Sequence, residues 1–278
     1  MSKQATETKS NGQNNKASSL VHQTDASGNQ QHNRSGGGED DDDAGFSLFC
    51  CLFGCCGTSS NSIYNNRSDG PYVSPTSMLP PKLSEDKHKK TLVVDLDETL
   101  VHSTFQPAEK ADIVLPINIE GALYRVYVRI RPFAKEFLEE MSKHFEIVLF
   151  TASLQKYADP LLDLLDKSHC IRSRLFRRHC TYLSSSGAFV KDLSRMGRQM
   201  SDIFLIDNSP LSYSLQPENG VPCTSFIDDP SDTELKDIIP FLIELAKSHD
   251  VRNDTKKWKR HFNVMYQNRS KEKMESKK

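Results

Sequence analysis

The sequence lacks any long apolar run, and its N-terminus has no hydrophobic segment. A transmembrane helix needs roughly 20 apolar residues and a secretory signal peptide needs an apolar core, so we expect neither. Cysteine is sparse in the apolar part of the chain, where Cys170, Cys180 and Cys223 lie far apart. Such spacing does not form the disulfide framework of a small secreted domain, and it indicates an intracellular protein.

Apolar residues are also scarce in the first third of the chain. Residues 1–88 are rich in Ser, Asn, Gln, Gly and Asp, which is typical of a disordered arm. Residues 89–250 are dense in Leu, Ile, Val and Phe, and about 160 residues suffice to bury a core, so we expect one monomeric folded domain. Residues 251–278 carry ten Lys and Arg against three Asp and Glu, a net charge of +7. We interpret them as a basic, polar, solvated tail that reads no nucleic-acid bases, with an unspecific nuclear-import signal near 256–260 as the alternative.

One apolar patch, residues 46–56, interrupts the arm. Its cysteines are Cys50, Cys51, Cys55 and Cys56. Two adjacent pairs this close strain the tetrahedral geometry of a zinc site, whereas cysteines beside Phe and Leu suit S-acylation. Two or more acyl chains would hold the protein at a membrane, although anionic lipid would repel the acidic run at 39–43. We favour acylation and peripheral membrane contact over an apolar segment without a ligand.

Three apolar, β-branched runs each end abruptly in a polar residue: 92–95, 147–151 and 203–207. Continuous apolar runs of this length suit strands that are buried on both faces of a parallel sheet. With helical spacing between them, they predict an α/β fold with a doubly wound parallel sheet. Ligands of such sheets bind beyond the carboxyl ends of the strands, and the residues placed there are Asp95, Thr151 and Asp207.

Apolar spacing predicts three helices in this domain. One begins near Pro132, which suits a first helical turn, and a second buries Leu164 with its neighbouring leucines. A third begins at Ser231, with Glu234 at the spacing of a capping box. Pro240 should kink this last helix.

Residues 113–119 and 123–130 alternate apolar with polar around Glu120-Gly121, which predicts a β-hairpin inserted after the first strand. Its position places it beside the carboxyl end of the sheet. We expect it to form a small sheet that serves as a lid or a ligand platform. The alternative is a plain extension of the main sheet at one edge.

Asp95 and Asp97 stand two residues apart at the end of the first predicted strand. Phosphoryl transfer uses such a pair, because one carboxylate attacks phosphorus while the other gives a proton to the leaving oxygen and later takes one from water. Mg²⁺ suits the site because it accepts oxygen ligands and screens the phosphate. Asp-x-Asp alone is weak support, since glycosyltransferases and surface loops also contain it. Here it ends an apolar run and continues into Glu-Thr-Leu-Val, which argues against a surface loop.

Residues 95–103, DLDETLVHS, resemble the signature of the small C-terminal-domain phosphatases, a branch of the haloacid dehalogenase superfamily. Further segments of this chain are similar to the same family over 149–153, 157–160, 190–194 and 205–210. The resemblance covers about residues 91–249. It implies a haloacid dehalogenase-like catalytic domain and a hydrolase that dephosphorylates phosphoserine or phosphothreonine in proteins.

The resemblance also implies the roles of the carboxylates. Asp95 would be the nucleophile and Asp97 the general acid and base. Mg²⁺ would be held by Asp95, the backbone carbonyl of Asp97, and Asn208. ATPases of the superfamily have Thr at the position of Asp97, so this carboxylate favours a phosphatase that completes its turnover.

Three further residues receive roles from the resemblance. Thr151 would hydrogen-bond the transferring phosphoryl group, and Lys191 would neutralise its charge in a dry site. Asp207 would organise the metal shell and Lys191. Each has a plain alternative: Thr151 could simply end a strand, Lys191 could be solvated, and Asp207 with Asn208 could form a turn. Together these alternatives require four segments to converge by coincidence.

The implied substrate is a phosphoserine followed by proline, whose rigid ring fills an apolar groove at low entropic cost. The residues that the resemblance assigns to this groove are Phe105, Ile117, Ile119, Val126, Leu154 and Tyr157, and Arg177 would bind the peptide. The alternative for Ile119 and Val126 is the core of the hairpin. The best-known family substrate is the Tyr-Ser-Pro-Thr-Ser-Pro-Ser repeat of RNA polymerase II, which implies a role in transcription and residence in the nucleus, with the cytoplasm or a membrane surface as alternatives.

Two other functions remain as alternatives. The cysteine patch would suit a lipid or small-molecule phosphatase, and a phosphoprotein-binding module without turnover is the second. The Ser-rich segment 183–188 is longer than in close relatives and is expected to alter specificity. Residues 72–77 read Y-V-S-P-T-S, close to the polymerase repeat, so the linker could occupy its own groove when phosphorylated at Ser74 or Ser77, although coincidence is the favoured interpretation.

Overall fold

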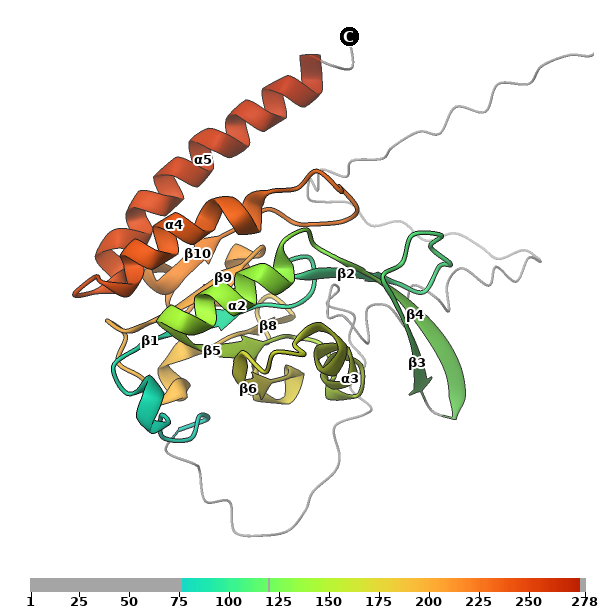
Figure 1. Cartoon of the computed structure of the whole chain (residues 1–278), viewed down its shortest axis with the longest axis horizontal. Helices are drawn as coiled ribbons and strands as arrows, with labels where there is room; N and C mark the ends of the chain where they lie inside the picture. Colours follow the sequence, from blue (N-terminus) through green and yellow to red (C-terminus); the bar gives the residue numbers. More distant parts are fainter. Residues whose placement is uncertain (1–76, 120, 276–278) are drawn as a thin grey trace, which may run out of the picture. The chain divides into compact units, whose positions relative to one another are not determined.

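The computed structural model describes residues 77–119 and 121–275, with side chains as far as residue 264 (Figure 1). Most of the predicted arm, 1–88, lies outside this part of the chain. The cysteine patch at 46–56 and its predicted acylation therefore lie outside the described residues. The same holds for Ser74.

A five-stranded parallel sheet forms the centre of the domain. Its strands are β1 (Lys90–Val94), β5 (Phe145–Phe150), β6 (Ile171–Leu175), β9 (Ile203–Asp207) and β10 (Gly220–Pro222). Their order is β10-β9-β1-β5-β6, so the chain builds outward from β1 to one edge and then returns to build the other (Figure 1). This reversal at β1 confirms the predicted doubly wound α/β fold.

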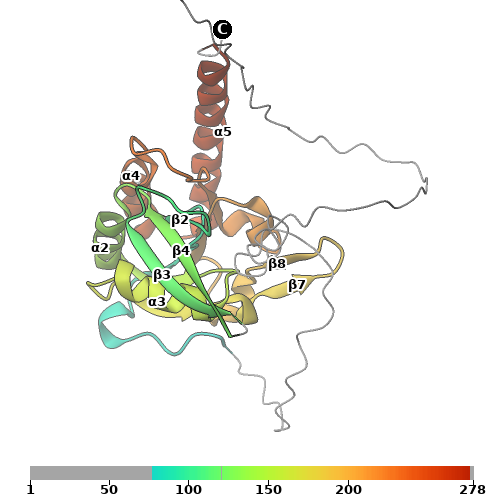
Figure 2. The same ribbon diagram turned by 90° about the vertical axis from the view of Figure 1, so that its right-hand side faces the viewer.

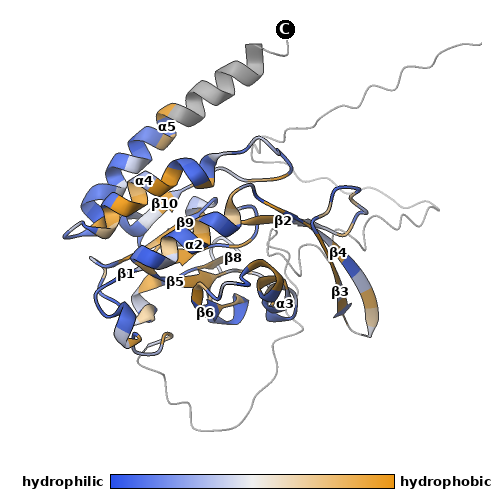
Figure 3. Cartoon of the chain, viewed as in Figure 1, coloured by the Kyte–Doolittle hydropathy of each residue, from blue (hydrophilic) through white to orange (hydrophobic). Residues whose placement is uncertain are grey.

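Alternate residues of each strand face opposite sides of the sheet, because side chains alternate along a strand. Leu92 and Val94 belong to a core cluster with α2 (Ala134–His144), α3 (Gln155–Leu165) and α4 (Glu234–Ala246). Val93 belongs to a second cluster on the other face, which is covered by short 3-10 turns, η3 (Leu193–Met196) and η4 (Pro210–Tyr213). Burial on both faces explains why the three central strands β9, β1 and β5 are mostly apolar (Figure 3).

The predicted hairpin is confirmed as part of a separate antiparallel sheet. This sheet contains β2 (Val101–Thr104), β3 (Ile113–Ile119) and β4 (Ala122–Ile130) in the order β2-β4-β3. Because β4 pairs with β2 and β3, the alternative of an extension of the main sheet is wrong. Gly121 has a φ of 91°, which suits glycine in the turn, and its N–H donates to Asn118 Oδ1 at 2.9 Å.

The helices differ from the prediction at their starts and on one face. Helix α2 begins at Ala134, because Phe133 adopts a left-handed φ of 65°. Leu164 is 40% exposed on α3, so its predicted burial is wrong. Helix α4 begins at Glu234 rather than Ser231. The Glu234 carboxylate accepts a hydrogen bond from the backbone N–H of Thr224 at 2.9 Å, so it does not form the predicted capping box.

Part of the predicted tail is folded. Helix α5 (Val251–Glu275) buries Val251, Thr255 and Trp258 at a spacing that repeats one helical face. Trp258 Nε1 donates to the carbonyl of Pro222 at 2.8 Å, and its ring stacks on Phe241 with centroids 5.1 Å apart. The expectation of a solvated tail therefore does not hold for residues 251–258. No helix within the described part of the chain is long and apolar enough to cross a membrane.

The chain enters the domain away from the carboxyl ends of the strands. Ser77 Oγ lies 2.9 Å from the carbonyl of Met196. The nearby Arg198 donates to Glu146 at the start of β5 and to the carbonyl of Pro80 at 2.9 Å. Ser77 is thus held near the amino ends of the strands, which disagrees with the hypothesis that it enters the predicted groove.

Replacement of Trp258 by alanine is expected to lower the free energy of unfolding by about 3–5 kcal/mol, because it leaves a cavity and an unpaired carbonyl at Pro222. Urea unfolding followed by circular dichroism measures the change. Lys257→Ala is the matched control, since Lys257 is exposed on the same helical turn. Equal stability of the two variants would show that α5 does not belong to the cooperative fold.

Candidate active site

Three predicted site residues meet at the carboxyl edge of the sheet. Asp95 directly follows β1, Thr151 directly follows β5, and Asp207 is the last residue of β9. These strands are adjacent and parallel, so their carboxyl ends lie together, at the edge that faces the viewer in Figure 2. The backbone N–H of Asp95 donates to the carbonyl of Ile206 at 3.0 Å, which fixes the end of β1 against β9.

A tight turn places Asp97 at the same edge. After β1 the backbone N–H of Leu100 donates to the carbonyl of Leu96 at 2.8 Å. Glu98 within this turn has a left-handed φ of 56°, an uncommon conformation for a residue with a side chain. Strain of this kind often marks functional segments. The turn brings both carboxylates of the Asp-x-Asp pair to the end of the sheet.

Lys191 lies between two buried carboxylates. Its Nζ donates to Asp207 Oδ2 at 2.6 Å and also to Asp95 Oδ1. Burial alone would lower the pKa of Lys191, but the charges of Asp207 and Asp95 outweigh burial and raise this pKa above its ordinary value. The group therefore remains an ammonium ion at neutral pH. The structure thus brings together three residues that stand far apart in the sequence.

Asp97 is held by three hydroxyl groups. Thr151 and Ser153 donate to Oδ2 at 3.1 Å and 2.7 Å, and Tyr157 donates to Oδ1 at 2.9 Å. Burial, together with the charges of Glu98 and Asp95, raises the pKa of Asp97 to about 7, although the bonds from Ser153 and Tyr157 oppose the increase. This carboxyl group can therefore exchange a proton near neutral pH.

The oxygen atoms of Asp95 and Asn208 converge on one side of the site. The Thr99 hydroxyl lies 2.9 Å from Asp95 Oδ2 and 3.4 Å from Asn208 Oδ1. Asn208 Nδ2 donates to Ser225 Oγ at 2.9 Å, which turns the amide oxygen toward Thr99. Among the described residues no group of three or more His, Cys, Asp or Glu is arranged to hold a metal. The predicted ligand set instead uses carboxylate, amide and carbonyl oxygens, which is the chemistry that Mg²⁺ prefers, and the convergence of Asp95 and Asn208 fits it.

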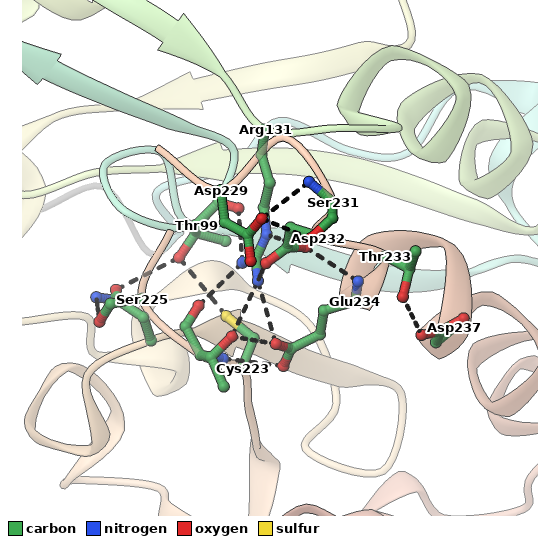
Figure 4. Close-up of polar contacts among 12 residues, drawn as sticks. Thr99, Arg131, Cys223, Ser225, Asp229, Ser231, Asp232, Thr233, Glu234 and Asp237 are labelled. Carbon is green, nitrogen blue, oxygen red and sulfur yellow. Dashed lines mark hydrogen bonds and ion pairs between the residues drawn. The ribbon is translucent and has the colours of Figure 1, made fainter. Parts of the chain in front are cut away.

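A buried arginine supports this side of the site. Arg131 is fully buried, and its Nη1 donates to the carbonyl of Thr99 at 3.2 Å and to the carbonyl of Thr224 at 2.9 Å. Its Nη2 donates to Asp232 Oδ2 at 2.9 Å and to Glu234 Oε2 at 3.1 Å (Figure 4). Arg131 thereby joins the turn that carries Thr99 to the loop that precedes α4.

The predicted substrate groove is mostly packed in this structure. Ile117, Val126 and Tyr157 are buried in the main core cluster, and the Tyr157 hydroxyl also lies 2.5 Å from Ser103 Oγ. The partly buried residues packed against the same cluster include Phe105, Ile119 and Leu154. Arg177 is nearly buried, and its Nε donates to the carbonyl of Ala152 at 2.5 Å. The assignment of these residues to a substrate remains a prediction.

The sequence does not predict every residue that contacts the site. Ser153 and Thr99 lie inside segments that resemble the family, so the motifs could have identified them. Arg131 and Ser225 lie outside these segments, and no spacing rule marks them. Their contacts depend on the packing of the loop 224–233 against the end of β4.

Residues 90–252 match the family model of the NLI interacting factor-like phosphatases, and the chain belongs to this family. It is 55% identical over 168 residues to CTD small phosphatase-like protein 1 of Caenorhabditis elegans, covering 60% of this chain and 34% of that protein. It is 52% identical over 174 residues to the human CTD small phosphatase-like protein, covering 63% and 62%. It is 50% identical over 174 residues to the human carboxy-terminal domain RNA polymerase II polypeptide A small phosphatase 1, covering 63% and 66%. The matched part of the chain spans less than two thirds of each of these relatives, and the resemblance noted in the motifs is confirmed.

Replacement of Arg131 by methionine is expected to lower the free energy of unfolding by about 3–5 kcal/mol, because it leaves the buried carboxylate of Glu234 without its cation. Thermal and urea unfolding measure this loss. Arg129→Met serves as the control, since Arg129 makes one long bond of 3.3 Å to the carbonyl of Asp228 and should change stability by roughly 0.5 kcal/mol or less. A similar small loss for both variants would contradict the structural role of Arg131.

Proposed function

We propose that this protein is a magnesium-dependent protein serine/threonine phosphatase that forms an aspartyl-phosphate on Asp95. The single observation that carries the proposal is the buried cluster of Lys191 with Asp95 and Asp207, next to Asp97 with its own hydroxyl donors. A buried ammonium beside a carboxylate offers charge to a dianionic group that enters the site. Membership of a phosphatase family supports this chemistry.

Each residue has a defined task in the proposed reaction. A carboxylate oxygen of Asp95 attacks phosphorus, and the bond from phosphorus to the serine oxygen breaks. Asp97 gives its proton to the leaving oxygen, then takes a proton from the water that hydrolyses the aspartyl-phosphate. Lys191 and the Thr151 hydroxyl bind the phosphoryl oxygens, while Asp207 keeps Lys191 in place. The nucleophile is regenerated when inorganic phosphate leaves.

Mg²⁺ would be held by Asp95, the carbonyl of Asp97, and Asn208. When bound, it screens the charge between the phosphate and the carboxylates. Thr99 and Ser225 orient the ligand oxygens of Asp95 and Asn208 through the contacts described above. These two residues support the ligands without contacting the phosphate.

The proposed substrates are phosphoserine or phosphothreonine residues in proteins, with Ser-Pro sites of the RNA polymerase II repeat as the first candidates. The name of one human relative refers to that polymerase. The partly buried residues Phe105, Ile119 and Leu154 would contact the proline, and Arg177 the peptide backbone. We propose action in the nucleus as a monomer. The full set of Asp95, Asp97, Thr151, Lys191, Asp207 and Asn208 argues against a binding module without turnover.

Phosphate release from polymerase-repeat peptides with phosphate on defined serines tests the proposal. The wild type should release phosphate with Mg²⁺ and should lose this activity in EDTA. Asp95→Asn should lower the rate at least about 10³-fold, since it removes the nucleophile. Release that survives Asp95→Asn or EDTA contradicts the mechanism. Hydrolysis of an aryl phosphate without any peptide activity would retain the chemistry and redirect the substrate to other proteins or lipids.

Replacement of Leu154 by alanine is expected to raise KM for a phosphoserine-proline peptide by roughly 3- to 10-fold, because it removes apolar surface that the proline would bury. The rate with an aryl phosphate should stay the same. Leu164→Ala is the matched control, since Leu164 is exposed ten residues later on α3. Equal effects of Leu154→Ala on both substrates, or no effect on the peptide, would remove this residue from the proposed groove.

A further inference from the structure

The hairpin of β7 (Thr181–Leu183) and β8 (Ala188–Val190) carries an aromatic face that the proposed mechanism does not use. Tyr182 pairs directly with Phe189 across the two strands, so both side chains lie on one face. Their ring centroids are 5.2 Å apart. Val190 is fully buried on the other face, whereas Tyr182 is 56% exposed. The hairpin thus packs one face into the domain and presents rings outward.

Arg177 connects this aromatic face to the active site. Its guanidinium carbon lies 5.3 Å from the centroid of the Phe189 ring. Its Nε donates to the carbonyl of Ala152, in the segment 151–153 whose hydroxyls bind Asp97. A continuous series of contacts therefore leads from the Asp97 carboxyl group to the outer face of the hairpin.

The second strand is tied to the site as well. Strand β8 ends at Val190, directly before Lys191, whose backbone N–H donates to the carbonyl of Ser212 at 2.7 Å. The β7–β8 hairpin and the β3–β4 hairpin lie on opposite sides of the carboxyl end of the sheet (Figure 2). A polypeptide with its phosphoserine at Asp95 therefore has one hairpin on each side.

The turn of the hairpin leaves the rings uncovered. It consists of Ser184, Ser185, Ser186 and Gly187, and Gly187 has a left-handed φ of 66°. Its three serines are exposed, and their short side chains cannot fold over Tyr182. A ring packed on one side and open on the other favours an offset or edge contact with a further ring. The positive charge of the Arg177 guanidinium, which lies against the Phe189 ring, also attracts the faces of aromatic rings.

We propose that the Tyr182–Phe189 face binds a tyrosine or proline ring of the substrate polypeptide, a few residues from the phosphoserine, on the side away from the β3–β4 hairpin. This inference rests on the proposed phosphatase function. The occupant is an extended segment of the substrate because the face continues directly from the catalytic edge. The segment 183–188 then determines specificity by keeping the rings exposed.

A panel of phosphoserine peptides tests the inference. Each peptide has an alanine and serine background with a single tyrosine or proline, placed at one position from three before to five after the phosphoserine. In the wild type one position should raise kcat/KM by about 3- to 10-fold over the ring-free peptide. Tyr182→Ser should remove this gain and leave the ring-free peptide and an aryl phosphate unchanged. Tyr182→Phe should retain the gain, and so should the control Val264→Ser, which changes a residue that is 59% exposed on α5.

The outcomes separate this inference from the proposed function. Hydrolysis of the aryl phosphate with no ring preference, or with the same preference in Tyr182→Ser, overturns the inference alone. An equal loss on every substrate in Tyr182→Ser also overturns it, because the effect is then structural. Failure of the wild type to hydrolyse even the aryl phosphate overturns both proposals. Sedimentation that shows a dimer dissociated by Tyr182→Ser, without ring preference, would assign the face to a second copy of the chain and overturn the inference.

Discussion

The position of one buried ammonium group determines how the carboxylates of this site are arranged. Lys191 lies between Asp95 and Asp207, and the two carboxylates meet only because β1 and β9 are neighbours in the sheet. Two carboxylates this deeply buried would repel each other strongly at low dielectric, so a cation between them is required for stability. The hairpin β7–β8 and the turn η4 place Lys191 there from outside the sheet. The strand order and the short elements on the second face are therefore part of the same electrostatic arrangement.

The two carboxylates of the Asp-x-Asp pair depend on different parts of the structure. Asp95 is fixed to the main sheet through β9 and Lys191. Asp97 accepts hydrogen bonds from α3 and from the segment after β5, and Tyr157 on α3 also contacts Ser103 on β2. The proposed nucleophile thus belongs to the main sheet, whereas the proposed acid is positioned where the inserted sheet meets α3. A movement of the inserted sheet would change the surroundings of Asp97 before those of Asp95.

The sequence predicts β1, β5 and β9 and the polar edge where they end, because strands buried on both faces leave continuous apolar runs. It does not predict β6, which contains two arginines, or β10, which has only three residues. Asp95, Thr151 and Asp207 follow from those runs without any motif. Lys191 follows a strand of only three residues, so only the resemblance to a family identifies it. The starts of α2 and α4 were mispredicted because tertiary contacts override local signals at Phe133 and Glu234. In α5 the buried positions 251, 255 and 258 have helical spacing, but the surrounding lysines obscure it.

Both edges of the main sheet are closed to further strands. At one edge β10 has only three residues and includes Pro222, and helix α5 lies beside it (Figure 1), with Trp258 Nε1 donating to the carbonyl of Pro222. At the other edge β6 carries Arg172 and Arg174, which are engaged by acidic groups of neighbouring segments. Short strands, proline and charge are the means by which proteins avoid edge-to-edge association. Helix α5, which begins in the basic C-terminal region, therefore also helps to protect this sheet from edge-to-edge aggregation.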